Sequence, residues 1–529
     1  MSAALTLPTD LARRAAAHKR LTALALGLFS AFGFAPLALW PVALLAIGGF
    51  VLLLGRVEGR REAFLLGWLF GLAHFTFGNN WIATAFTYQA EMPAVLGWAA
   101  VPLLALYLAL YPALAALGAR LFIREGAAGW PLALAFAGTW IVSEWLRSWI
   151  FTGYAWNPFG VVLLSGFARP GIAALAPWLG TYALSGLAVL LGAGAALLLY
   201  RRQLVLLGFL AALVTAGMLW PGPEEGEGTL RYTLVQPDIR QEELNQGQFY
   251  EANFRKTAAL SAPVRAGEHR LVLWPESGVP DYLLDGYPQR YYDYVTAFGN
   301  PDLARLRIGR TIGPGSLLMT GAVDLEFRNG EAAGARNAVT ALDETGAIRG
   351  HYAKAHLVPY GEYLPMRYWL EPIGLSRLVP GAIDFWPGPG PRTLDLGGWG
   401  KAGVQVCYEI VFSGQVTDRK HRPDYIFNPS NDGWFGSFGP PQHLAQARLR
   451  AIEEGLPILR STTTGISAVI DAHGVVRAHI GQHVPGRLDG IIPPALPPTL
   501  FAKLGNLLPL CWAAALLVIA AIALRLRRR

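Results

Sequence analysis

Apolar residues follow one another through most of residues 20–220, with few charges between them, and again through residues 504–524. Between these regions, residues 222–493 show the mixed apolar and polar pattern of a globular domain. A helix that crosses a bilayer core needs about 20 mostly apolar residues. Eight segments approach or exceed that length: 21–36, 38–55, 63–86, 94–117, 131–149, 172–200, 204–220 and 504–524. The pattern therefore predicts a multi-span α-helical membrane bundle of eight spans.

The same pattern divides the chain into three parts. Residues 1–220 are predicted to form an N-terminal membrane domain of seven spans, residues 228–493 a soluble domain, and residues 504–524 a last membrane helix. In the soluble part, strands are predicted at 229–235, 271–274, 316–323, 338–342, 402–406, 425–427, 458–461 and 468–471, and helices at 245–260 and 443–454. Hairpin turns are predicted at Gly346 and Gly474. This is an α/β domain of about 265 residues, large enough for a full hydrophobic core.

The distribution of charge fits a membrane protein. Hydrophobic residues make up 53% of the chain and charged residues only 15%, whereas a soluble domain carries about 25% charged residues. The net charge is +8. A nucleic-acid-binding protein gathers basic residues on a soluble face, but here they gather at the ends of apolar segments. The composition therefore argues against a nucleic-acid partner.

The basic residues also predict the orientation of the bundle. They lie in the N-terminal tail, after spans two, four and six, and in the C-terminal tail: Arg13, Arg14, Lys19, Arg20, Arg56, Arg60, Arg61, Arg120, Arg124, Arg201, Arg202, Arg525, Arg527, Arg528 and Arg529. The alternate loops are nearly free of them, with only Arg169 in residues 150–171. Cytoplasmic loops carry the excess of Lys and Arg. Both termini are therefore expected in the cytoplasm and the soluble domain outside it, in the periplasm of a bacterial inner membrane.

Cysteine usage favours thiol chemistry over a disulfide or a metal site. The chain has two cysteines, Cys407 in the soluble domain and Cys511 in the last apolar segment. One cysteine per region does not provide the ligand spacing of a zinc site, and the sequence has no HExxH motif. We expect neither a metal nor a cofactor. An unpaired cysteine outside the cytoplasm is exposed to oxidation, which suggests a chemical reason for Cys407.

Three short motifs in the soluble domain carry candidate chemistry. The first ends a strand at Glu276, the second holds Lys354 and Glu362 in one loop, and the third delivers Cys407 from a β-branched strand. Each motif alone has a plainer explanation: a helix-capping carboxylate, a surface ion pair and a small buried side chain. Together they are chemically coherent. A carboxylate can remove the thiol proton, and a lysine can stabilise the oxyanion that forms when the thiol attacks a carbonyl.

The Glu, Lys, Cys order with these flanking residues resembles the nitrilase superfamily, whose fold is an α-β-β-α sandwich. With seven spans before this domain and one after it, the chain resembles the apolipoprotein N-acyltransferase family in particular. The motifs that carry the resemblance are Glu144-Trp-Leu-Arg147, Lys354-Ala-His-Leu-Val-Pro-Tyr-Gly-Glu362-Tyr, Cys407-Tyr408-Glu409 and Asn428-Pro-Ser-Asn-Asp-Gly-Trp434. The resemblance covers nearly the whole chain.

The resemblance implies a role for each matching residue. Glu276 is expected to be the general base, Lys354 the oxyanion stabiliser and Cys407 the nucleophile. Glu362, Tyr408 and Glu409 are expected to support them. The chain departs from the family at Asn245, where the resemblance suggests a tryptophan that would hold the acyl chain; Phe249 or Tyr250 could fill that role.

The resemblance also implies the reaction and its partners. Cys407 would take an acyl chain from a membrane phospholipid as a thioester. The α-amine of an S-diacylglyceryl-cysteine at the N-terminus of an apolipoprotein would then accept it. The enzyme is expected to be a monomer embedded in the membrane.

Two alternatives to this function stay open from the sequence. A membrane-anchored amidase would use the same three residues with water as the acceptor, although one span would suffice for it. A transporter with an outer domain would need polar groups at mid-membrane depth, for which His74, Asn79 and Asn80 are the candidates.

Two further segments have two explanations each. The pair Glu144 and Arg147, among tryptophans, is either a structural ion pair or part of a lipid-access wall. The apolar segment 366–378 is either a lid on the bilayer or a buried loop.

Overall fold

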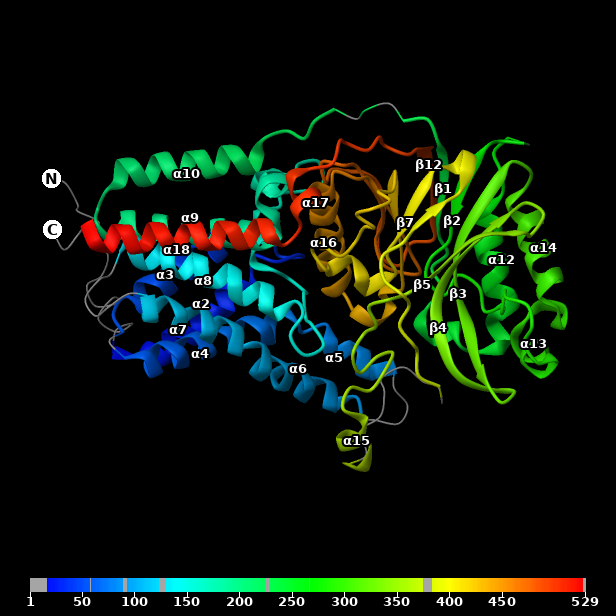
Figure 1. Ribbon diagram of the computed structural model, residues 1–529, viewed down its shortest axis with the longest axis horizontal. Helices are drawn as coiled ribbons and strands as arrows, with labels where there is room; N and C mark the ends of the chain where they lie inside the picture. The colour runs from blue at the N-terminus through cyan, green and yellow to red at the C-terminus, as the bar shows by residue number, and fades with distance from the viewer. Residues whose placement is uncertain are drawn as a thin grey trace.

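The computed structural model describes residues 17–57, 59–88, 93–122, 129–224, 226, 228–265, 267–373 and 383–526. One end of the molecule is a bundle of apolar helices, and the other end is built on two β-sheets (Figure 1). The bundle contains α2 (Lys19–Ala31), α3 (Trp40–Leu54), α4 (Arg60–Gly78), α5 (Ile82–Ala85), α6 (Val95–Leu108), α7 (Leu110–Phe122), α8 (Trp130–Arg147), α9 (Ala176–Tyr200), α10 (Leu204–Leu219) and α18 (Leu507–Leu526).

Within the described residues, three helical stretches are long and apolar enough to cross a membrane: Val95–Phe122, Gly171–Tyr200 and Leu507–Leu526. Two shorter apolar helices, Trp40–Leu54 and Leu204–Leu219, coincide with other predicted spans. The predicted span 63–86 is divided into α4 and α5. The structure thus bears out apolar helices at the predicted places, and a bundle of eight spans stays a prediction.

Small residues allow the helices of the bundle to approach closely. A Cβ added at Gly192 of α9 would lie 2.3 Å from the carbonyl oxygen of Leu44 on α3, and one added at Gly48 of α3 would lie 2.1 Å from the carbonyl oxygen of Gly192. A Cβ on Gly27 of α2 would lie 2.0 Å from the Phe70 carbonyl oxygen on α4. Association through van der Waals contact between small residues is typical of membrane helices.

The soluble part contains two six-stranded sheets. The first has the order β12-β1-β2-β3-β4-β5 and the second β11-β10-β9-β8-β7-β6. In each sheet the central pairs, β1 with β2 with β3 and β7 with β8 with β9, are parallel. The strands are β1 (Arg231–Gln236), β2 (Arg270–Leu273), β3 (Ser316–Arg328), β4 (Glu331–Asp343), β5 (Ile348–Ala353), β6 (Thr393–Asp395), β7 (Lys401–Val404), β8 (Tyr425–Ser430), β9 (Ile458–Thr462), β10 (Ser467–Ile470), β11 (Val476–Ile480) and β12 (Gly486–Ile491).

Helices cover the outer faces of both sheets. Helices α12 (Tyr250–Ser261) and α14 (Pro301–Ile312) contribute Phe254 and Ile308 to a core on the first sheet. Apolar side chains from both sheets share a second core between the layers. Helix α16 (Gly439–Glu454) lies between the second sheet and the bundle (Figure 1). The predicted α-β-β-α sandwich is confirmed, as are the eight predicted strands and the helix at 443–454; the helix predicted at 245–260 begins at Tyr250.

Helix α16 is buried on all sides: every residue except Pro441 and Ala445 is buried. Its side chains bond directly to the membrane part of the chain. The Gln442 Oε1 atom accepts hydrogen bonds from the Trp156 indole and from Asn157 Nδ2, at 2.8 and 2.9 Å. The Glu453 carboxylate accepts one from the Thr181 amide of α9 at 2.5 Å. The soluble part and the bundle therefore share one interior along this helix.

Candidate active site

The three residues of the predicted triad lie just beyond strand ends, where α/β folds place their sites. Glu276 follows β2 and Lys354 follows β5, both in the first sheet, whereas Cys407 follows β7 in the second sheet. All three side chains are buried. The structure brings them together at the junction of the two sheets, so residues 131 positions apart in the chain (407 minus 276) form one cluster.

Two hydrogen bonds fix the Glu276 carboxylate, one from a side-chain amide and one from a backbone amide. Its Oε1 accepts a hydrogen bond from Asn337 Nδ2 at 2.6 Å, and its Oε2 accepts one from the Asn431 amide at 2.7 Å. Burial raises the pKa of the Glu276 carboxyl above its ordinary value, although the Lys354 ammonium acts in the opposite direction. A carboxylate of raised pKa is a stronger proton acceptor, as a general base requires.

Lys354 is held between two carboxylates. Its Nζ lies 2.9 Å from Glu362 Oε2 and 3.7 Å from Glu276 Oε1. Burial opposes the charged form, but the Glu362 and Glu276 carboxylates outweigh it and raise the pKa of Lys354, so that its amine stays an ammonium. Asn337 Nδ2 also donates to Glu362 Oε1 at 2.9 Å and so ties the two carboxylates together. Glu362 thus orients Lys354, in line with its predicted supporting role.

Cys407 begins a short 3-10 helix, η8 (Cys407–Val411), and has a positive φ of 50°. This left-handed conformation is uncommon for a residue with a Cβ atom and marks a sharp turn at the strand exit. Burial, followed by the nearby Glu276 carboxylate, raises the pKa of the thiol well above its ordinary value, against the effect of Lys354. The resting group is therefore a thiol that needs a base when it attacks.

Glu409 joins the loop that carries Lys354 to the turn that carries Cys407. Its carboxylate accepts hydrogen bonds from the Tyr352 hydroxyl at 2.8 Å, the Ala355 amide at 2.7 Å and the Val406 amide at 2.7 Å. These donors come from both sheets, so Glu409 fixes one half of the site relative to the other. The buried Tyr408 points to the membrane part, where its hydroxyl lies 3.5 Å from the Gly153 carbonyl.

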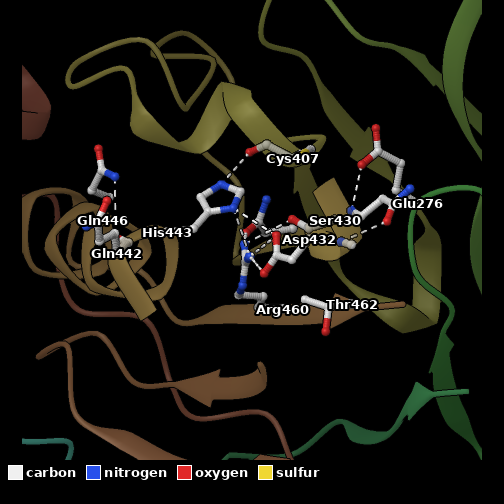
Figure 2. A network of polar contacts seen from close by, with 12 residues as sticks. Glu276, Cys407, Ser430, Asp432, Gln442, His443, Gln446, Arg460 and Thr462 are labelled. Carbon is white, nitrogen blue, oxygen red and sulfur yellow. Dashed lines mark hydrogen bonds and ion pairs between the residues drawn. The ribbon is translucent and has the colours of Figure 1, made fainter. Parts of the chain in front are cut away.

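A second buried network contacts the nucleophile from the opposite side, as Figure 2 shows. His443 Nε2 lies 3.0 Å from the carbonyl oxygen of Cys407, and its Nδ1 lies 3.0 Å from both Arg460 Nη2 and Asp432 Oδ1. Arg460 also bonds both Asp432 oxygens, at 2.8 and 2.7 Å. The sequence motifs do not include His443 or Arg460, and Asp432 appears only within a motif. The one feature of the sequence that could have pointed to His443 is its position at the start of the helix predicted at 443–454.

The same cluster has the donor set of a metal site, since ligand atoms of Cys407, Asp432 and His443 lie within 4.8 Å of one another. The protein already uses these groups, however. Asp432 forms a double contact with Arg460, and His443 bonds the Cys407 carbonyl. A cation would also sit against the guanidinium of Arg460, so the geometry favours an internal network over a metal centre.

An apolar cavity of about 1060 Å³ lies between α2, α4, α5 and α6. Its walls include Phe77, Trp81 and Phe438. The Trp81 ring packs against Trp156 with centroids 4.7 Å apart, and Trp156 packs against His443 at 5.2 Å. A continuous run of aromatic rings thus connects the cavity with the residue that bonds Cys407.

The remaining candidate residues have more limited contacts. Glu144 and Arg147 form a buried ion pair at 3.9 Å, and Glu144 accepts a hydrogen bond from the Phe159 amide, which supports a structural role. Asn245 is exposed at the end of α11 (Gln241–Leu244). The structure describes the apolar segment 366–378 as far as Ile373, and the remainder lies outside the described residues. In the described portion, Tyr368 and Trp369 are exposed.

Comparison with known proteins agrees with this geometry. Residues 26–194 match the apolipoprotein N-acyltransferase N-terminal domain family, and residues 234–492 match the carbon-nitrogen hydrolase family. An apolipoprotein N-acyltransferase of Rhodopseudomonas palustris is 34% identical over 512 residues, covering 92% of this chain and 91% of the relative. One of Bradyrhizobium diazoefficiens is 35% identical over 540 residues, covering 97% and 95%.

Among solved structures, a CN-hydrolase superfamily protein of Xanthomonas campestris is 18% identical, with a TM-score of 0.33, over 49% of this chain and 89% of that chain. The two sheets, the matched residue ranges and the full-length relatives lead to one assignment. The chain belongs to the apolipoprotein N-acyltransferase family, and its soluble part is a carbon-nitrogen hydrolase domain.

Proposed function

We propose that this enzyme transfers a fatty acyl chain from a membrane phospholipid, through a thioester on Cys407, to the α-amine of the N-terminal S-diacylglyceryl-cysteine of apolipoproteins. The observation that carries this proposal is the convergence of Glu276, Lys354 and Cys407 in one buried cluster. The family relationship supports a lipoprotein acceptor and a lipid donor.

In the first half-reaction, the Cys407 sulfur attacks the ester carbonyl of the donor while Glu276 takes the thiol proton. The Lys354 ammonium stabilises the oxyanion of the tetrahedral intermediate. When the intermediate collapses, the bond to the glycerol oxygen breaks, and Glu276 returns its proton to that oxygen. The products are the Cys407 thioester and a lysophospholipid.

In the second half-reaction, the acceptor amine attacks the thioester carbonyl. Glu276 takes a proton from the attacking nitrogen, Lys354 again stabilises the oxyanion, and the carbon–sulfur bond breaks. The proton passes to the Cys407 sulfur, which restores the thiol. The product is an amide-linked, triacylated lipoprotein, and the same base and cation serve both steps.

The membrane part supports a lipid substrate. The apolar cavity exceeds the roughly 300–1,000 Å³ of common ligand pockets, with a volume of about 1060 Å³, and we place the donor acyl chain there. We further propose that the enzyme is a monomer with eight spans in a bacterial inner membrane. Its parts are an N-terminal membrane domain at residues 1–220, a periplasmic domain at residues 228–493 and a last membrane helix at residues 504–524. Both substrates are lipids of that membrane surface.

The experiment follows the intact mass of the purified enzyme with phospholipid alone, with an added diacylglyceryl lipopeptide, and with the N-acetylated lipopeptide. We expect a long-lived acyl increment with phospholipid alone, because a transferase excludes water from its thioester. The free amine should remove the increment rapidly, and the acetylated peptide should leave it. Rapid loss to water without acceleration by the amine would favour an amidase-like hydrolase instead.

The two cysteines provide a matched control for the site of acylation. Cys407→Ser should gain no acyl increment, as an ester or otherwise, because a serine hydroxyl is a far weaker nucleophile without a histidine base. Cys511 is exposed on α18, whereas Cys407 is buried in the cluster, so Cys511→Ser should be acylated at the native rate. Equal losses in both variants would contradict the assignment of the nucleophile.

A further inference from the structure

The Cys407 turn is held from behind by a histidine that the triad does not include. His443 lies on α16 and is buried. Arg460 on β9 is also buried, as is Asp432, which contacts both of them. Figure 2 shows the histidine ring between the Cys407 carbonyl and the Arg460 guanidinium. His443 contacts the peptide group between Cys407 and Tyr408, and Arg460 and Asp432 contact His443 from behind.

The partners of His443 define its protonation. A carbonyl oxygen only accepts hydrogen bonds, so Nε2 carries the hydrogen that faces Cys407, at 3.0 Å. Nδ1 lies 3.0 Å from both Arg460 Nη2, which only donates, and Asp432 Oδ1, which only accepts, and in the neutral ring it accepts from Arg460. Burial and the Arg460 guanidinium lower the pKa of His443, which agrees with a neutral ring. Asp432 is satisfied by Arg460 and balances its charge.

The nucleophile needs such a hold. A left-handed backbone at a residue with a Cβ atom persists only when the surroundings impose it, and Cys407 has a φ of 50°. The direction of the Cα–Cβ bond follows from the backbone conformation of the residue. A donor fixed on the Cys407 carbonyl therefore also fixes the direction of the sulfur relative to Glu276 and Lys354.

We infer that His443 is a positioning residue for the nucleophile: held by Arg460 and Asp432, it donates a hydrogen bond to the Cys407 carbonyl and so aims the thiol at its base. This inference rests on the proposed function only for the identity of the nucleophile. The sulfur attacks in one half-reaction and departs in the other, so its direction affects both.

The test measures the alkylation of Cys407 by iodoacetamide, followed by intact mass, in the Cys511→Ser background. His443→Gln keeps an amide donor at about the reach of Nε2, whereas His443→Leu removes the donor at similar volume. A misplacement of about 1 Å costs on the order of 10²-fold in rate. We expect His443→Leu to react about 10²-fold more slowly and His443→Gln to recover most of the native rate.

A second readout is the single-turnover rate of acyl-enzyme formation from phospholipid vesicles. The same order of variants is expected, with the maximal rate lowered and the half-saturating phospholipid concentration unchanged, because His443 does not line the cavity in which we place the donor acyl chain. If alkylation follows the expected order but no variant, nor the native enzyme, becomes acylated, the positioning role stands and the proposed function fails.

Gln446→Met is the matched control. Gln446 is buried on the same helix and accepts a hydrogen bond from the Asn157 amide at 3.1 Å, and its hydrogen bonds within the described part of the chain do not involve Cys407. In the Gln446→Met variant, iodoacetamide should alkylate Cys407 at the native rate. If His443→Leu does not fold, His443→Asn replaces it, because its amide is too short to reach the carbonyl. The inference is wrong if Cys407 is alkylated at the native rate in His443→Leu or His443→Asn. It is also wrong if His443→Gln loses as much of the alkylation rate as these two variants do.

Discussion

Burial determines how the reacting groups of the site share their protons. The raised pKa of Cys407 leaves a thiol at neutral pH rather than a preformed thiolate, and the raised pKa of Glu276 makes its carboxylate a stronger proton acceptor. Lys354 stays charged because two carboxylates face it. In the proposed mechanism the site therefore stores no reactive thiolate, and the nucleophile forms only as Glu276 removes the thiol proton during attack.

This arrangement predicts the pH dependence of acyl-enzyme formation. Because only the carboxylate form of Glu276 accepts a proton, the native rate should fall as the pH drops through the raised pKa of this group. Glu276→Gln should lower the rate at neutral pH by about 10² to 10⁴-fold. The remaining reaction needs free thiolate, so it should rise about tenfold per pH unit.

Single-turnover rates between pH 6 and 8 check this. Glu326→Gln is the control, since Glu326 pairs with Arg336 away from the triad. If Glu276→Gln reacts at the native rate, or if its rate does not rise steeply with pH, then Glu276 is not the general base.

Glu409 predicts a stability effect rather than a loss of a reacting group. In Glu409→Gln, the new amide would face backbone N–H donors, and a buried donor left unpaired costs about 1 to 3 kcal/mol. Burial raises the pKa of Glu409 to about 7. Since the folded state binds this proton more tightly than the unfolded state, proton binding by Glu409 adds to the free energy of unfolding. This stabilisation is complete below the ordinary pKa of 4.5 and is lost as the pH rises through about 7.

The melting temperature of the native protein should therefore exceed that of Glu409→Gln by more at pH 5 than at pH 8. Thermal unfolding in detergent at the two pH values measures both. A gap that stays constant would show that Glu409 does not change its protonation on folding.

The sequence predicts the candidate residues whose motifs are local, and it does not predict those whose partners are distant. Glu276, Lys354, Cys407, Glu362 and Glu409 could each be read from a short run of neighbours. Asn337 and His443 could not, because an amide on a strand and a histidine on a helix acquire their roles only from partners 61 and 36 positions away. Pairing across a fold leaves no periodic signal in one sequence.

The strands that sequence analysis missed are the four edges of the two sheets: β5, β6, β11 and β12. Central strands are buried on both faces and show continuous apolar runs, such as β2 and β9. An edge strand meets water and is more polar, as in β12, whose residues are partly or fully exposed. Hydrophobic patterning thus finds the middle of a sheet more readily than its borders.

Helix packing in the bundle predicts opposite effects at two glycines. Gly192→Ala should destabilise the protein by about 1 to 3 kcal/mol, the usual cost of overpacking, because its methyl group would lie 2.3 Å from the Leu44 carbonyl oxygen. Gly208 on α10 has nothing within 4 Å of an added Cβ, so Gly208→Ala should be neutral or stabilising by up to about 1 kcal/mol. Melting temperatures in one detergent compare them, and equal shifts would contradict close α3–α9 packing.

The residues of the proposed triad divide between the sheets, with Glu276 and Lys354 following strands of the first and Cys407 following a strand of the second. The alignment of base and nucleophile thus depends on the packing of one sheet against the other. Ser461 of β9 bonds the Val235 carbonyl of β1 at 2.7 Å and contributes to that packing. Catalytic geometry in this molecule is a property of the whole sandwich.

The position of the sandwich relative to the bundle predicts where each end of the bundle lies. The turn between α9 and α10 is at the end far from the sheets (Figure 1). A phosphatase reporter that folds only outside the cytoplasm should be active when fused after Gly228 and inactive when fused after Arg202, because the basic residues there favour the cytoplasm. The opposite pattern of activity would reverse the proposed orientation.

The burial of α16 on all sides limits how this domain can be engineered or exchanged. Residues 228–493 look like a self-contained unit in the sequence, yet cutting them free would expose a helix whose glutamines, arginines and apolar side chains are already committed to the bundle. A soluble amidase domain grafted in their place would lack these partners. A replacement domain must therefore reproduce these contacts to keep the interior that the two parts share.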